Sequence, residues 1–406
     1  MTNMLSCSII QVPIRSVNDN RDSLLDNALN NTQLGINTRI YASLLPPPMT
    51  FHTLGIPDSS SIVTLTAFDV VDDPGAVKVP AVALFGPILP GHENLPVPVF
   101  AFLVENVTTK QRVMFDLGPR KDAENAAPPI VELIKGAFPI SRDITEQLVD
   151  AGIPLDSISA AIWSHAHVDH IGDMFKFPPS TDLVFGRDTL TDTYPAKPTS
   201  TLLESDFAGR NLVKVDFTKS ELEFGGLKAH DYFGDGSFYL LDVPGHLSGH
   251  VCGLARVTPT SFILLGADAC HHAGALRPTE HLHRSFPCPG ALLAATRSSV
   301  SAAHFSPLDS TGAFDLASRT TPLLDVADGG IFEDPPTARA SLKELAKFDA
   351  NADVFVVLAH DISLVPVVGP FPKLLNNWQA KGWKDEVTWA FIDEGNPAFR
   401  FSPKAA

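Results

Sequence analysis

The sequence Ser-His-Ala-His-Val-Asp-His at residues 164–170 decides how the rest of the chain is interpreted. It directly follows an apolar run at residues 158–163, whose composition predicts a β-strand. Three histidines and one aspartate therefore stand within six residues at the end of that strand. A lone histidine is usually an ordinary polar residue, but costly polar groups gathered this closely favour a bound ion that compensates them.

The spacing within this motif indicates two neighbouring metal positions. Side chains alternate along an extended segment, so His165 and His167 point the same way. The turn that follows can bring Asp169 and His170 round to a second point. Imidazole and carboxylate groups are ligands for zinc and for similar divalent ions, so the motif predicts a metal centre.

Three further segments place a potential ligand at the end of an apolar strand. Residues 237–243 lead into Pro-Gly-His-Leu-Ser-Gly-His, which contains His246 and His250. A second apolar run ends in Asp268, and the run at residues 354–359 leads into His360. Each segment alone has a plausible structural interpretation, but together with the first motif they complete a set of seven ligands.

Composition limits the classes of function. The chain has 406 residues, of which 44% are hydrophobic and 19% charged, a balance typical of globular proteins. Its formal net charge of −16, without a basic run, excludes a nucleic-acid binder and argues against docking on anionic membranes. No apolar stretch approaches about 18 residues, and no convincing signal peptide is present, so we expect a cytoplasmic protein.

Several elements can be predicted around these motifs. Residues 1–60 are polar and then proline-rich, and we interpret them as an N-terminal arm, with residues 61–406 forming the main domain. Strands are expected at 61–71, 80–85 and 97–104. An Asp143-x-x-Glu146 capping box predicts a helix that ends near Gly152, and a late helix is expected at about 337–348. Residues 271–333 carry no clear period and are expected to form a cap or loop insertion.

With these motifs in this order, the chain resembles the metallo-β-lactamase fold superfamily of hydrolases. The resemblance implies an α/β fold, an αββα sandwich of two facing sheets with helices outside and metals at one edge. It extends over residues 61–361 and rests on FDLG at 115–118, SHAHVDH at 164–170, PGHLSGH at 244–250, Asp268, and AHD at 359–361.

The resemblance also implies how the ligands divide between two divalent ions. Zinc is the first choice, with iron, manganese and cobalt compatible. In related sequences Asp116 supports the metal loop without binding metal, and the second histidine of the PGHLSGH loop, His250, packs nearby. The implied ligands are His165, His167 and His246 for one ion, Asp169, His170 and His360 for the other, and Asp268 as a bridge between them, with a hydroxide between the ions.

Within the superfamily, two groups fit the sequence best. Quorum-quenching N-acyl homoserine lactone lactonases resemble it in all seven ligands and in the His-Asp ending at 360–361. Glyoxalase II-type thioesterases share the PGHxxGH loop, but they carry Gly-Asp where this chain has Ala267-Asp268. We therefore expect a hydrolase that opens a lactone or carboxylic ester with a metal-bound hydroxide. A thioester hydrolase is the alternative, and a metal-stabilised scaffold without activity is a second one.

Two residues are predicted to act on the substrate. Asp169 is the first, because the second ion, with Asp169 beside it, can receive the leaving-group oxygen and its proton. His271 occupies a position where bacterial lactonases often carry a tyrosine that contacts the substrate carbonyl, so it is a candidate substrate contact, with a surface histidine as the equal alternative. The expected partner is a small lactone or ester, without nucleic acid or membrane, and the extended arm is compatible with a homodimer.

Overall fold

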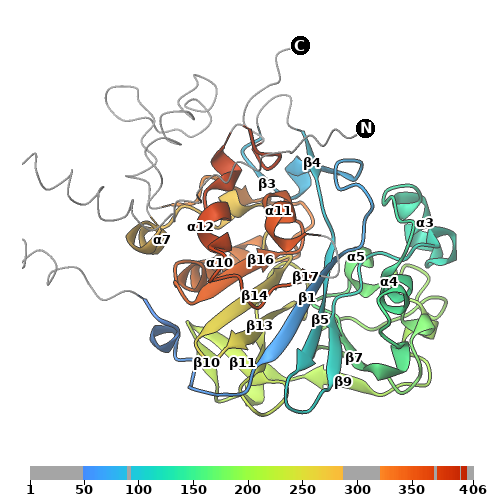
Figure 1. The fold of residues 1–406 in the computed structure, drawn as a ribbon. Helices are drawn as coiled ribbons and strands as arrows, with labels where there is room; N and C mark the ends of the chain where they lie inside the picture. The colour runs from blue at the N-terminus through green and yellow to red at the C-terminus, as the bar shows by residue number, and fades with distance from the viewer. Residues whose placement is uncertain (1–48, 89–92, 287–320, 370–372, 394, 400–406) are drawn as a thin grey trace, which may run out of the picture. The chain divides into compact units, whose positions relative to one another are not determined.

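Two β-sheets lie face to face, with helices on both outer sides, in a computed structural model of the chain (Figure 1). The structure describes residues 49–88, 93–286, 321–369, 373–393 and 395–399. This layering confirms the αββα sandwich expected from the sequence. Two small two-stranded sheets accompany the main ones, β2 (Lys78–Pro80) with β4 (Asn94–Pro96), and β3 (Phe85–Gly86) with β15 (Asp325–Val326).

The first sheet has seven strands in the order β17-β1-β5-β6-β7-β8-β9. Its β6 to β9 strands run parallel, and its other neighbours are antiparallel. The strands are β1 (Val63–Asp69), β5 (Phe100–Asn106), β6 (Arg112–Phe115), β7 (Ile158–Ile162), β8 (Asp182–Gly186), β9 (Leu212–Val215) and β17 (Lys373–Leu374).

The second sheet has six strands in the order β10-β11-β12-β13-β14-β16. Its strands pair antiparallel except β14 and β16, which are parallel. The strands are β10 (Glu223–Phe224), β11 (Leu227–Asp231), β12 (Phe238–Asp242), β13 (Val251–Thr258), β14 (Ser261–Ala267) and β16 (Val354–Leu358).

Strand periodicity explains why both faces of the second sheet are covered. In β14, Ile263 and Leu265 point into the apolar layer between the two sheets. The alternate residues, Phe262 and Leu264, belong to a separate apolar layer under the helices on the outer side. A third layer, which includes Trp163, lies between the first sheet and its own helices. Three apolar layers therefore separate the four layers of the sandwich.

The helices are mostly short. Asp143 caps α4 through a complete capping box with Glu146, as the sequence predicted. The helix predicted at 337–348 is α10, and its apolar side covers the second sheet. The helices are α3 (Pro128–Ile134), α4 (Ile144–Asp150), α5 (Val168–Ile171), α6 (Glu204–Phe207), α7 (Glu280–Ser285), α10 (Pro335–Asp349), α11 (Val365–Val368) and α12 (Trp383–Val387).

One strand prediction was wrong in its extent. The run at 80–85 is divided between the end of β2, a 3₁₀ turn at Ala81–Ala83 and the start of β3. The strand predicted at 61–71 is β1, and the one predicted at 97–104 begins slightly later, as β5. Among the described residues, no helix combines the length and apolar character needed to cross a bilayer.

The expected arm and cap are described only in part. Residues 1–48 of the arm and 287–320 of the cap lie outside the described residues. Phe51, just after the first gap, is 2% exposed, and its backbone N–H donates to Asp353. In the described part of the cap, a 3₁₀ turn at Ala273–Ala275 and α7 follow the strand that ends before Asp268.

Candidate metal centre

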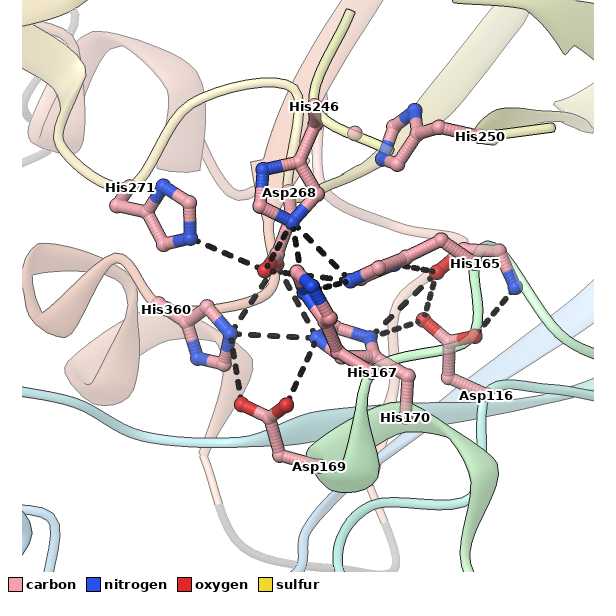
Figure 2. Close-up of polar contacts among 12 residues, drawn as sticks. Asp116, His165, His167, Asp169, His170, His246, His250, Asp268, His271 and His360 are labelled. Atoms are coloured by element: carbon pink, nitrogen blue, oxygen red, sulfur yellow. Dashed lines mark hydrogen bonds and ion pairs between the residues drawn. The ribbon is translucent and has the colours of Figure 1, made fainter. Parts of the chain in front are cut away.

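The candidate ligands meet because five strands end at the same edge of the sandwich. Strands β6 and β7 are parallel neighbours, so their carboxyl ends lie together. Strands β12, β14 and β16 run in one direction within the second sheet, and their carboxyl ends face the same site. The loops after these strands supply every residue labelled in Figure 2 except Asp169 and His170, which lie on α5.

His165, His167 and His246 form the first group with Asp268. His165 Nε2 and His167 Nδ1 lie 3.0 Å apart, and His246 Nε2 is 3.2 Å and 3.0 Å from these two nitrogens. Three imidazole nitrogens from two sheets therefore converge on one point.

Asp169, His170 and His360 form the second group. The Nε2 atoms of His170 and His360 are 3.3 Å apart, and Asp169 Oδ2 lies 3.5 Å from His360 Nε2. Asp169 Oδ1 is 3.9 Å from His170 Nε2. The carboxylate thus faces both imidazoles of its group.

Asp268 lies between the two groups and presents one oxygen to each. Its Oδ2 is 3.6 Å from His165 Nε2 and 3.4 Å from His246 Nε2. Its Oδ1 is 3.2 Å from His170 Nε2 and 3.1 Å from His360 Nε2. The structure therefore brings together all seven residues that the sequence proposed as ligands, while their metal binding stays a proposal.

The donor set fits divalent ions on two counts. A tetrahedral ion with nitrogen ligands about 2.0–2.1 Å away would hold those nitrogens about 3.3 Å apart, close to the spacing in the first group. Asp268 Oδ1 is buried and has no hydrogen-bond partner in the described part of the chain, although two imidazole nitrogens face it. A cation in the first position would satisfy the converging nitrogens, and one in the second position would satisfy this oxygen.

The outer nitrogens of three candidate ligands are held by other groups. His170 Nδ1 lies 2.8 Å from Asp116 Oδ2, and His360 Nδ1 lies 2.8 Å from the carbonyl oxygen of Pro98. His165 Nδ1 is 3.0 Å from Ser164 Oγ. Such contacts fix the tautomer and orientation of metal-binding histidines, which is the supporting role predicted for Asp116.

Asp116 is itself well fixed. Its Oδ1 accepts a hydrogen bond from the Ser164 backbone N–H at 2.7 Å, and its Oδ2 accepts one from the Ser164 hydroxyl at 2.8 Å. Its φ of 59° is uncommon for a residue with a side chain. The residue just after β6 is thus held in a conformation that aims its carboxylate at the metal loop.

The two groups and Asp268 together form a candidate metal cage, and burial and charge set the protonation states of its residues. Burial lowers the pKa of His165, His167 and His246, which leaves their nitrogens neutral and free to bind a cation. Burial alone would also lower the pKa of His170, but the carboxylates of Asp268, Asp116 and Asp169 outweigh burial and raise this pKa. Burial likewise opposes ionisation of Asp268, but the surrounding imidazoles lower its pKa and keep it an anion.

His250 lies beside the cage and not in it. Its Nδ1 is 2.9 Å from the Val243 carbonyl oxygen, and its ring packs 5.3 Å from the His165 ring and 5.7 Å from the His246 ring. Burial lowers its pKa to about 4, so it is neutral at physiological pH. This placement is compatible with the packing role expected for the second histidine of the loop.

His271 is buried next to Asp268. Its Nε2 lies 3.0 Å from Asp268 Oδ2, and its ring stacks on that of His360 with centroids 5.6 Å apart. Together with Asp268 and His360 it forms a third cluster of potential ligand atoms. A surface position is therefore excluded, and contact with substrate stays a prediction.

Sequence reasoning missed the segment that supports the His246 loop. The backbone N–H groups of Glu333 and Asp334 donate to the carbonyl oxygens of His246 and Gly245, both at 2.9 Å. The Glu333 carboxylate accepts from the Ser248 backbone N–H at 2.6 Å. Just before these residues, the Phe332 ring packs 5.0 Å from the His246 ring. Neither motif nor periodicity marked this segment.

The candidate cage is closed except on one side. The side chain of Asp169 is 21% exposed, whereas those of Asp268, His271 and His360 are each 3% exposed. His165 and His170 are fully buried. Asp169 therefore marks the side from which a substrate would approach.

Comparisons with known proteins support the same family. A model of the metallo-beta-lactamase superfamily matches residues 94–258. The metallo-hydrolase mfmC of Annulohypoxylon moriforme is 37% identical, over 87% of this chain and 92% of that protein. The gamma-lactamase FDB1 of Fusarium pseudograminearum is 35% identical, over 87% of this chain and 86% of that protein.

Two other matches bear on the length of the relatives and on the fold of the chain. The cytochrome P450 monooxygenase mpaDE of Penicillium brevicompactum is 40% identical, and the match spans only 38% of that protein. The structure of a quorum-quenching N-acyl homoserine lactone hydrolase aligns with 78% of this chain and 99% of its own, at a TM-score of 0.50 and 17% identity, which shows a shared fold. From the fold, the edge cluster and its relatives, the chain belongs to the metallo-β-lactamase superfamily.

Proposed function

We propose that the chain is a hydrolase that uses two divalent ions to open a small cyclic acyl compound, a lactone in the first instance. The shared carboxylate of Asp268 carries the proposal. Its two oxygens face different imidazole groups at 3.1–3.6 Å within one buried cage. Because the imidazoles of the first group are neutral, an ion pair would involve only the oxygen that faces His170 and His360, whereas a bridge between two cations would use both oxygens.

The residues that would hold the ions are those of the two groups. Bound divalent ions supply a water that ionises near neutral pH and a Lewis acid toward the acyl oxygen. The nitrogen and oxygen donors favour zinc, with iron, manganese and cobalt compatible. One ion would be held by His165, His167 and His246, the other by Asp169, His170 and His360, and both by Asp268.

Asp169 is the residue best placed to act on the substrate itself. Its side chain is partly exposed, as is that of His167, and it lies on α5 just after the pair His165 and His167. We assign it the proton transfer to the leaving group: its carboxylate would take the proton of the attacking hydroxide and give it to the leaving-group oxygen as the ring opens. The other carboxylate, Asp268, is buried between imidazoles and is therefore kept for the ions.

Cysteine chemistry is not needed for this reaction. Burial raises the pKa of the Cys252 thiol well above its ordinary value and that of Cys270 to about 12. The Cys252 thiol also donates to the Gly266 carbonyl oxygen at 3.3 Å. Both thiols stay protonated, so neither offers a nucleophilic thiolate.

A γ-lactam is the second candidate substrate, and a specific observation favours it. A relative of similar length that is 35% identical carries the name gamma-lactamase. An amide nitrogen leaves only when it is protonated, so the role proposed for Asp169 would matter more for a lactam than for a lactone. The thioester alternative gains no comparable support from the residues of the cage.

Three matched substrates separate these candidates. N-hexanoyl homoserine lactone, the corresponding thiolactone and the corresponding γ-lactam differ only in the leaving atom. Formation of the ring-opened product would be followed by liquid chromatography with zinc-loaded protein, with and without a chelator, because lactam opening yields a carboxylate and an ammonium group and so releases no net proton near neutral pH. We expect chelator-sensitive opening of the lactone.

Each other result has a defined meaning. Opening of the lactam alone would replace the first candidate with the second. A preference for the thiolactone of more than tenfold would indicate a thioester hydrolase. Failure to open any of the three rings, with both ions bound, would contradict a ring-opening function and favour the scaffold alternative.

A further inference from the structure

We infer that His271 is a positioning residue that holds the shared carboxylate of Asp268 in place, and that it does not contact the substrate. The inference deepens the proposed function, because it rests on Asp268 being the ligand shared by two ions. It concerns a residue that lies outside both groups of proposed ligands (Figure 2).

The contact that carries the inference joins His271 Nε2 to Asp268 Oδ2 at 3.0 Å. Both side chains are 3% exposed, so water competes little for either atom. A carboxylate oxygen has two lone pairs, and Oδ2 can therefore accept this hydrogen bond while it faces the first metal position. The bond would fix the rotation of the carboxylate, which decides whether each oxygen reaches its own ion.

Two ring contacts hold the His271 imidazole in the required plane. It stacks on the His360 ring at an angle of 6°, with centroids 5.6 Å apart. The Phe332 ring meets it nearly at right angles, also at 5.6 Å. His271 Nδ1 has no hydrogen-bond partner in the described part of the chain, so no second bond turns the ring away from Asp268.

The same geometry argues against a substrate contact. A residue that binds a substrate carbonyl needs a free donor and access to the open side of the cage. The Nε2–H group of His271 already donates to Asp268. The His271 side chain is 3% exposed, against 21% for Asp169. His271 therefore lies on the buried side of the cage.

His272 provides a matched control beside it in the sequence. It is buried to the same degree, but its Nε2 donates to the Ala398 carbonyl oxygen at 3.0 Å, away from the cage. Its Nδ1 accepts from the Gly274 backbone N–H at 2.9 Å. Replacing either histidine removes a buried imidazole, but only the replacement at 271 removes a contact with Asp268.

The test measures zinc affinity without substrate, by competition with a chromophoric chelator. In His271→Phe, the ring contacts can persist while the donor is lost, and we expect zinc affinity to fall about 10–100-fold. His272→Phe should bind zinc as the unchanged protein does. His271→Gln restores a donor of similar reach and should recover most of the affinity, whereas the shorter side chain in His271→Asn should not.

Three results of this test would contradict the inference. Unchanged zinc affinity in His271→Phe, together with a raised KM for the substrate, would show that His271 contacts substrate and overturn the inference. If His271→Phe and His272→Phe lost equal zinc affinity, the effect would come from general packing and not from the contact with Asp268. Equal zinc affinities in His271→Gln and His271→Asn would lead to the same conclusion. Because zinc affinity is read without substrate, a failure of lactone hydrolysis leaves this test intact.

Discussion

Single residues in the cage are prepared for metal by their surroundings. Burial lowers the pKa of His165 and His246, so both are neutral and their lone pairs are available at physiological pH. His170 differs because the carboxylates of Asp116, Asp169 and Asp268 raise its pKa. A cation at the second position would have to displace this proton, and the contact with Asp116 would then orient a neutral imidazole.

Asp116→Asn tests this orienting role. The amide can still accept from the Ser164 backbone N–H, but its NH₂ group cannot accept from His170 Nδ1, now 2.8 Å from the carboxylate. We expect metal affinity to fall about 10–100-fold, with the protein still folded. Titration with zinc against a chelator measures the change, and circular dichroism of the variant checks the fold. Wild-type affinity would remove Asp116 from the site.

The sequence predicted the cage residues better than their surroundings. The spacing in SHAHVDH and the strand ends before His246, Asp268 and His360 reflect local geometry, which sequence patterns record. The placement of His271 depends on packing against His360 and Phe332, which are distant in the chain. Such contacts leave no local periodicity, so the sequence could not distinguish a buried histidine from a surface one.

Among the elements, α10 and the residues before it hold the loop that carries His246. Ser341 on α10 donates its hydroxyl to the Pro244 carbonyl oxygen at 2.7 Å. Gly245 has a φ of +123°, and a Cβ added there would lie 2.2 Å from the Ala338 backbone nitrogen. The close approach of helix and loop therefore requires glycine at this position.

Gly245→Ala should damage both stability and metal binding. The added methyl group meets backbone atoms, so the loop or α10 must move, at a cost of about 1–3 kcal/mol or more. Gly209→Ala is the matched control, because Gly209 also has a positive φ, of +72°, but has open space around its Cβ. Urea unfolding and zinc titration would compare the two variants. Equal losses would show that backbone strain alone, and not the contact with α10, is responsible.

Helix α6 contains a carboxylate that makes stability depend on pH. Burial and then the neighbouring Asp173 raise the pKa of Asp206 from 3.8 to about 6. The folded chain therefore favours the neutral acid, and its stabilising contribution is present below pH 4 and is lost as the pH rises through 6. The difference corresponds to about 3 kcal/mol at neutral pH.

Asp206→Asn should therefore be more stable than the unchanged protein at pH 8, by up to about 3 kcal/mol, with the gain shrinking toward pH 5. Urea unfolding at several pH values measures this. Glu204→Gln, on the exposed side of the same helix, should show no such trend. A constant difference between wild type and Asp206→Asn across this pH range would contradict the raised pKa.

Element boundaries show where sequence patterns were insufficient. The capping box of α4 and the apolar periodicity of α10 were predicted because both signals are local. The run at 80–85 looked like one strand, but its residues pair with two separate partners, β4 and β15. Strand pairing is a tertiary property, so the division could not be predicted from the composition of the run.

At the scale of the whole molecule, the candidate cage joins the two sheets. The loop after β7 in the first sheet and helix α5, which follows it, supply the four ligands of the main motif. The loops after β12, β14 and β16 in the second sheet supply His246, Asp268 and His360. Bound ions would therefore connect both halves of the sandwich, with Asp268 as the residue common to both positions.

The αββα architecture could be expected because the motifs and their order resemble those of the metallo-β-lactamase superfamily. The segments expected to form the walls of the site could not be predicted in this way. Residues 271–333 and the arm have no periodic pattern, and they lie partly outside the described residues. The choice of substrate is set by the residues around a site rather than by the fold that carries it, so the motifs predict the metal centre more closely than the substrate.

The central claim is a binuclear centre that shares Asp268, and native mass spectrometry of zinc-loaded protein tests it most directly. We predict two ions per chain for the unchanged protein. Asp268→Ala should lose both, whereas Asp188→Ala, which removes a carboxylate that is 67% exposed, should keep both. One ion or none in the unchanged protein, or two ions retained in Asp268→Ala, would contradict the account.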